Sequence, residues 1–103
     1  MSDLVLFPHI AVQIKLLSTE RGGRAEPIPG GEYRGILNAR GQHFSFRCEA
    51  PPGGLDLGST VTLDIEFLFP HLAVPFFQKR DEFNLWEIGT IGYGRVLKVY
   101  SAG

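Results

Sequence analysis

Apolar and polar residues alternate with a period of two over much of this sequence, which is the pattern of strands buried on one face. The stretch 60–69 shows it most cleanly. The residues expected to point inward are apolar: Val61, Leu63, Ile65 and Phe67. The residues expected to point outward are polar: Thr60, Thr62, Asp64 and Glu66. The stretch 10–16 alternates in the same way, with Ile14 inward and Lys15 outward. Both stretches are predicted to be half-buried strands.

Four further strands are predicted at 33–38, 43–49, 83–88 and 92–100. The first two are joined by a turn at 39–42 and form a hairpin, in whose second arm Phe44, Phe46 and Cys48 point inward. Glycine and proline interrupt the chain at 18–31 and 50–54. Pro70 and Pro75 bracket a short apolar segment, which predicts a turn or a crossing over a barrel end instead of a helix.

Six strands and no amphipathic helix predict an all-β fold, specifically a six-stranded antiparallel β-barrel. A barrel is favoured over a sandwich because closure removes exposed strand edges. We expect an N-terminal arm at 1–9 and one barrel domain at 10–100. The residues expected in the core are Ile14, Phe44, Phe46, Val61, Leu63, Ile65 and Trp86.

Length and charge narrow the class of protein. A chain of 103 residues has the size of one domain, and its net charge of -1 gives no general attraction to nucleic acid. Its single cysteine, Cys48, cannot form an internal disulfide, which fits a reducing compartment. The first seven residues lack a basic region, and no apolar run reaches the roughly 18 residues of a membrane span. We therefore expect a cytoplasmic protein with no membrane partner.

Five short motifs follow one another along the chain. They are Gly22-Gly23-Arg24 after the first strand, Gly31-Glu32-Tyr33-Arg34, Asp56-Leu57-Gly58, Phe69-Pro70-His71 and Gly92-Tyr93-Gly94 in the last strand. In this order they resemble the third, C-terminal β-barrel domain of elongation factor Tu. In that family the barrel follows a GTPase domain and helps to bind aminoacyl-tRNA and the exchange factor. This chain has no G-x-x-x-x-G-K-[ST] phosphate loop, so we expect no nucleotide partner.

No pattern indicates catalysis, a metal or a cofactor, and we expect a protein that is not an enzyme. Asp64 and Glu66 share a strand face, but that face has the composition of a solvated surface. Three histidines and Cys48 include no short-spaced ligand pair of the kind that structural zinc sites use. Cys48 is better interpreted as a small core residue.

Five arginines in the first half of the chain have two interpretations: Arg21, Arg24, Arg34, Arg40 and Arg47. They are a candidate RNA- or acid-binding face, because guanidinium groups bind oxyanions in a bidentate way. Alternatively, they are ordinary surface residues paired with Glu20, Glu26 and Glu32. The second interpretation is favoured because no aromatic residues alternate with the arginines of the loop 18–31.

The stretch 67–77 has an unusual density of apolar residues, which either close one barrel end as a plug or form a protein-binding patch. The patch would comprise Phe69, His71, Phe76, Phe77, Lys79 and Arg80. We therefore expect a free-standing, non-catalytic module with an unidentified protein partner. One alternative is an accessory protein of translation that binds tRNA or other RNA through the arginines. Another is a decoy or protective protein that imitates elongation factor Tu.

Overall fold

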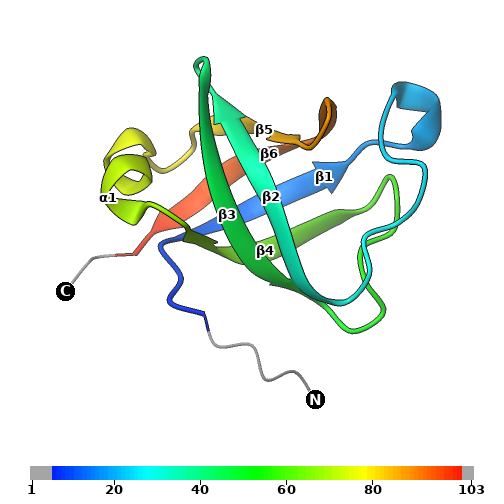
Figure 1. Ribbon diagram of the computed structural model, residues 1–103, viewed down its shortest axis with the longest axis horizontal. Helices are drawn as coiled ribbons and strands as arrows, with labels where there is room; N and C mark the ends of the chain where they lie inside the picture. The colour runs from blue at the N-terminus through cyan, green and yellow to red at the C-terminus, as the bar shows by residue number, and fades with distance from the viewer. Residues whose placement is uncertain (1–5, 101–103) are drawn as a thin grey trace.

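The computed structural model describes residues 6–100, which form six antiparallel strands and three short helical turns. The strands are β1 (Ile10–Leu16), β2 (Gly31–Ala39), β3 (Gln42–Ala50), β4 (Thr60–Phe67), β5 (Glu82–Trp86) and β6 (Thr90–Val99). They close into a barrel in the order β1-β4-β3-β2-β5-β6, as Figure 1 shows. The predicted six-stranded antiparallel β-barrel is therefore confirmed. Residues 1–5 of the predicted arm lie outside the described residues.

The alternation along the strands puts the residues predicted for the core in it or against it, with one exception. Leu63 and Ile65 of β4 are buried, whereas Asp64 between them is exposed. The exception is Trp86, whose placement in the core was wrong. Because Phe83 and Leu85 occupy the inward parity of β5, Trp86 points outward and its ring meets His43 edge-on at 5.5 Å.

The segment after β4 is helical, which corrects the prediction of a non-helical crossing. It forms α1 (Pro70–Ala73) and continues as the 3₁₀ turn η2 (Val74–Phe76); a third turn, η1 (Thr19–Arg21), follows β1. Each proline lies in the first turn of its helix, where its missing N–H needs no partner. The prolines therefore start these helices and do not prevent them.

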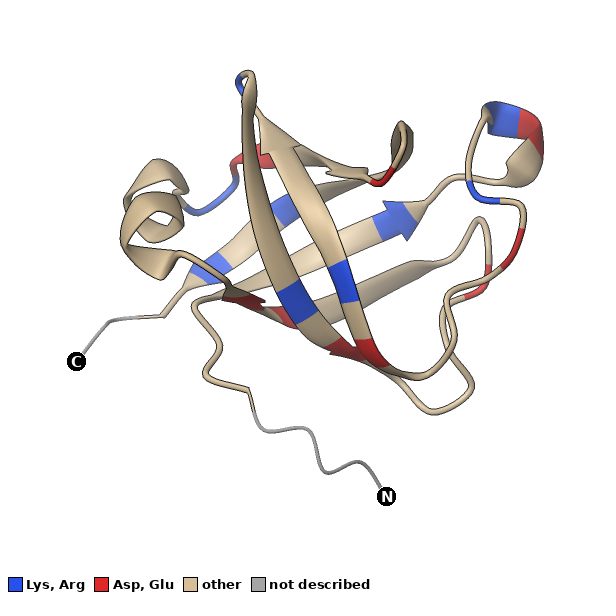
Figure 2. Cartoon of the chain, in the orientation of Figure 1, with Lys and Arg blue, Asp and Glu red and all other residues tan. Residues whose placement is uncertain are grey.

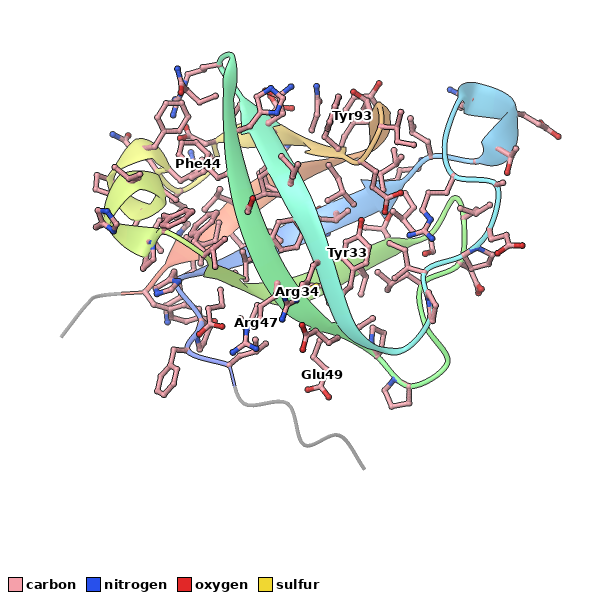
Figure 3. All side chains as sticks on the ribbon, in the orientation of Figure 1. Tyr33, Arg34, Phe44, Arg47, Glu49 and Tyr93 are labelled. Atoms are coloured by element: carbon pink, nitrogen blue, oxygen red, sulfur yellow. The ribbon has the colours of Figure 1, made fainter. Side chains whose placement is uncertain are left out.

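Aromatic rings under α1 and η2 close one end of the barrel. Phe44 packs against Phe76 and Phe77 at centroid distances of 4.9 and 5.4 Å, and the ring of Phe67 stacks on Phe77 at 5.6 Å. In Figure 3, Phe44 lies between β3 and the helical segment. The segment thus covers the barrel end, as the plug interpretation requires, and its other side remains available to solvent.

The β2–β3 hairpin turns through two residues with left-handed backbone conformations. Arg40 has φ 48° and Gly41 has φ 77°, which is the arrangement of a type I′ turn. This turn matches the right-handed twist of the two strands and sets their register from Gly31–Ala50 to Ala39–Gln42. The register in turn fixes which β3 residues lie beside α1.

Candidate protein-binding groove

The five arginines do not form one surface. Arg34 and Arg47 are register partners on β2 and β3, Arg40 lies at the tip of that hairpin, and Arg21 and Arg24 belong to the loop after β1. Figure 2 shows these basic positions spread over the molecule, with acidic residues near several of them. The structure therefore brings together only one pair of the five.

Four of the arginines are ion-paired. Arg24 contacts Glu87 at 3.0 Å, Arg40 contacts Asp81 at 3.5 Å, Arg34 pairs with Glu32, and Arg47 pairs with Glu66 and, at 3.9 Å, with Glu32. Only Glu32 of these partners is among the three glutamates expected from the sequence. The others are distant in the chain, because the barrel closure brings them to the arginines.

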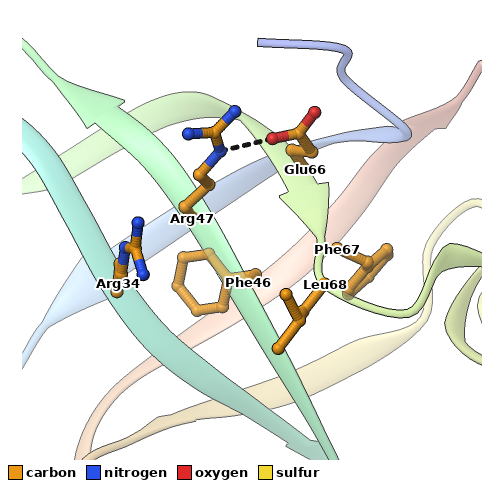
Figure 4. Close-up of a pocket in the computed structure, with 6 residues that line it drawn as sticks. All are labelled: Arg34, Phe46, Arg47, Glu66, Phe67 and Leu68. Atoms are coloured by element: carbon orange, nitrogen blue, oxygen red, sulfur yellow. Dashed lines mark hydrogen bonds and ion pairs between the residues drawn. The ribbon is translucent and has the colours of Figure 1, made fainter. Parts of the chain in front are cut away.

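Arg34 and Arg47 line a hollow of about 390 Å³ on the outer face of the barrel. Figure 4 shows its six lining residues, with the Arg47–Glu66 bond across it. Burial alone raises the pKa of Glu66, but hydrogen bonds from Arg47 and from the backbone N–H of Phe7, with the charge of Arg47, lower it overall. An ionised Glu66 makes this hollow an unfavourable site for a phosphate.

A second polar cluster joins distant parts of the chain. The hydroxyl of Tyr33 donates a 2.6 Å hydrogen bond to Glu87, which also accepts a 3.0 Å bond from Arg24. Burial raises the pKa of Tyr33, and the bond to Glu87 raises it further. The cluster ties the loop after β1 to β2 and to the end of β5, so its role is structural.

The six residues predicted for protein binding separate into four locations. Phe69 and the half-buried Phe76 line a groove beside β3, whereas His71 lines a different hollow with Phe7 and Pro8. Lys79 and Arg80 are exposed in the turn before β5. Phe77 is only 3% exposed, so it lies in the core and not on the surface. Its inward direction follows from its place in the aromatic cluster.

A groove with a mainly apolar lining lies beside the first residues of β3. It measures about 460 Å³ and lies between β3 and α1, with eight lining residues: Gln42, His43, Phe44, Ser45, Phe69, Leu72, Ala73 and Phe76. The guanidinium of Arg40 lies over the ring of Phe76 at 4.1 Å and donates a hydrogen bond to its carbonyl oxygen. No carboxylate is among the eight lining residues.

Exposed apolar side chains are concentrated at 68–72, where Phe69 and Leu72 line this groove and Leu68 lines the neighbouring hollow. Leu68, Phe69 and Leu72 are 65%, 56% and 62% exposed, and they are three of six large apolar residues exposed in the described part of the chain. Leu68 and Leu72 were missing from the predicted site. The density of apolar residues in 67–77 was their only sequence signal, and it did not indicate which side chains face outward.

A scan against protein-family models found no match to this sequence, and a search of the curated proteins found no significantly similar sequence. Among residues 6–100, no helix is long and apolar enough to cross a membrane. The same residues contain no group of three or more His, Cys, Asp or Glu side chains arranged to hold a metal ion.

Proposed function

We propose that this chain is a non-catalytic protein-binding module whose contact surface is the groove between β3 and α1, together with Leu68. The observation that carries the proposal is the concentration of exposed apolar side chains at 68–72. Single exposed apolar residues are ordinary, but a contiguous exposed patch marks an interaction site. The polar residues Gln42 and His43 border this patch, as the rim of a protein interface does.

The groove is also preorganised for binding. Pro70 and Pro75 restrict the backbone of the segment, and the buried Phe77 anchors its end in the core. A rigid segment loses less conformational entropy when a partner orders it. Phe69 and Leu72 are therefore presented by a frame that need not rearrange.

A non-catalytic role is supported by the state of the groups that could otherwise react. Burial raises the pKa of the Cys48 thiol to about 12, so the reactive thiolate is scarce at neutral pH. Asp64 accepts a 2.7 Å hydrogen bond from the hydroxyl of Tyr100, and Glu66 is paired with Arg47. None of these groups lines the groove.

We further propose that the barrel is of the type found in the third domain of elongation factor Tu, in a cytoplasmic protein. Its support is the order of the motifs, with Gly22-Gly23-Arg24 after β1 and Gly92-Tyr93-Gly94 within β6. The unpaired Cys48 is compatible with a reducing compartment. On this proposal the shared property is the shape of the scaffold, and binding resides in this chain's own groove.

Affinity capture with matched variants tests the binding proposal. Leu72→Glu places a charge in the groove, whereas Ile88→Glu places one on a side chain that is 97% exposed between β5 and β6. We expect a protein that is recovered with the unmodified chain and Ile88→Glu but lost with Leu72→Glu. Recovery of the same proteins by all three chains would contradict the proposal.

A further inference from the structure

We propose that the groove between β3 and α1 takes up an extended segment of a partner protein, which adds as a strand to the open edge of β3. The inference rests on the proposed function and specifies its partner. The bound segment carries apolar side chains at alternating positions. This mode of recognition uses main-chain hydrogen bonds for affinity and side-chain contacts for specificity.

One edge of β3 is only partly paired with the neighbouring strand of its own sheet. On one side β3 pairs with β2 over its full length, but on the other it pairs with β4 only at Phe46 and Arg47. One more bond follows, from the N–H of Leu68 to the carbonyl of Ser45 at 3.0 Å. After Leu68 the chain turns away into α1, so no strand of residues 6–100 lies beside the first residues of β3 on this side.

The backbone groups of His43 point into the groove. In an antiparallel sheet the N–H and C=O groups of alternate residues face the same strand edge. Since the carbonyl of Ser45 faces β4, the N–H and C=O of His43 face that same edge. Within residues 6–100, no strand pairing or other backbone hydrogen bond occupies His43 there. An incoming strand would find one donor and one acceptor at this position.

The wall of the groove selects the side chains of the segment. Phe69 and Leu72 are apolar and more than half exposed, and they stand opposite the β3 edge. Side chains of an added strand alternate between its two faces, so every second one can contact this wall. These positions favour apolar residues because contact removes apolar surface from water on both partners.

The charge around the groove does not select the charge of the segment. The lining contains no carboxylate, and Arg40 lies at the end where β3 begins, with its guanidinium over Phe76. Beyond the other end, Arg34 lies in the hollow next to Leu68, and its side chain is 75% exposed. Arg40 is already paired with Asp81 and Arg34 with Glu32, so neither position adds a free positive charge for a carboxylate of a partner.

A second copy of this chain fits the groove less well than a single segment. The same edge of β3 has α1 beside it, so pairing two copies edge to edge would bring two helical segments against each other. A volume of about 460 Å³ also suits a narrow extended chain instead of another barrel. The occupant is therefore a segment that is extended and accessible in its own protein.

Peptides selected from a displayed library of random 12-residue sequences test the inference on the full chain. We expect the selected sequences to alternate apolar and polar residues. His43→Pro should weaken the best synthetic peptide by about tenfold or more, since it removes the donor at the edge. His43→Ala removes the same side chain but keeps that donor, so it should bind the peptide more tightly than His43→Pro. Proline is tolerated where an edge N–H faces outward, and circular dichroism checks that the variant folds.

Amide hydrogen exchange gives a readout that needs no variant. With the peptide bound, the His43 amide should exchange more slowly, because it becomes hydrogen-bonded. If Leu72→Glu abolishes binding of the peptide but the His43 amide stays unprotected and His43→Pro binds normally, strand addition is wrong and the proposed function stands. If the selection yields no peptide that binds in the groove, strand addition is also wrong. The capture experiment tests the proposed function separately. A dimer that His43→Pro disrupts would mean that a second copy occupies the edge, which overturns the inference too.

Discussion

The backbone N–H of Leu68 donates a 3.0 Å hydrogen bond to the carbonyl of Ser45, and this bond is where the chain after β4 parts from β3. Up to this bond, β3 and β4 are neighbouring strands of one closed barrel. Beyond it, β3 borders a groove whose opposite wall is α1. The departure of the chain at Leu68 thus produces both the open strand edge and the apolar wall opposite to it.

Gly94 of β6 should be intolerant of a side chain. A Cβ atom there would lie 2.3 Å from the Phe83 ring and 2.7 Å from the carbonyl oxygen of Gln13. Gly94→Ala should therefore lower the free energy of unfolding by about 1–3 kcal/mol through overpacking. Gly89→Ala is the control, because a Cβ there meets no atom within 4 Å, and it should stay within about 0.5 kcal/mol. Equal denaturant midpoints for the two variants would contradict the packing described for this strand.

Tyr33→Phe should destabilise the barrel modestly and change its response to alkali. Loss of the hydrogen bond to Glu87 should lower the free energy of unfolding by about 0.5–1.5 kcal/mol at neutral pH. The pKa of Tyr33 is raised in the folded state, so the unfolded state ionises first as the pH rises above its usual value of 10.0. The stabilisation is complete below that pH and is lost above it.

Urea unfolding at increasing pH measures this effect. The stability of the unmodified chain should fall more steeply above about pH 10 than that of Tyr33→Phe. Parallel alkaline slopes for the two chains would show that the Tyr33 hydroxyl is not held in its un-ionised form by burial and Glu87.

Glu66→Gln should change how stability depends on pH in acid, whereas Tyr33→Phe changes it in alkali. The folded-state pKa of Glu66 lies below its usual value of 4.5, because bonds from Arg47 and Phe7 outweigh the effect of burial. Its ionised form therefore stabilises the fold above that pH, and the contribution disappears as the pH falls through the lowered pKa. Glu66→Gln should be less stable at neutral pH and should lose less stability between about pH 5 and pH 2. An unchanged acid slope would rule out this contribution.

Binding to tRNA should be weak. The net charge is -1 and four of the five arginines are already paired with carboxylates, so few counterions would be released. Fluorescence anisotropy with labelled tRNA at physiological salt should give a Kd weaker than about 10 μM. A tight, salt-sensitive complex that is lost on Arg21→Ala or Arg24→Ala would favour the RNA alternative instead.

The strands could be predicted because their signal is local. Alternation alone placed Ile65 inside and Asp64 outside, and the Gly41 turn indicated the hairpin. Trp86 lies outside the core because its neighbour Leu85 takes the inward parity of β5. The helix α1 was missed because Pro70 was interpreted as a helix breaker, although proline suits a first helical turn.

The groove could not be predicted, because it depends on contacts between distant residues. Ser45 and Leu68 meet only when the barrel closes, and the position of Leu72 opposite β3 depends on where β4 ends. The ion pairs have the same origin: Arg24 and Glu87 are 63 residues apart. Sequence patterning indicated how much apolar surface the stretch 67–77 carries, but burial of Phe77 and exposure of Phe69 are properties of the packed structure.

Site-specific photo-crosslinking in the cells that produce the protein tests the central claim most directly. A photoreactive phenylalanine analogue replaces Phe69 in the groove or, as the matched control, Ile88 on the exposed β5–β6 turn. We predict a discrete crosslinked protein from position 69 that is absent from position 88 and disappears when Leu72→Glu is added. The same products from both positions, or none from position 69, would contradict a protein-binding groove between β3 and α1.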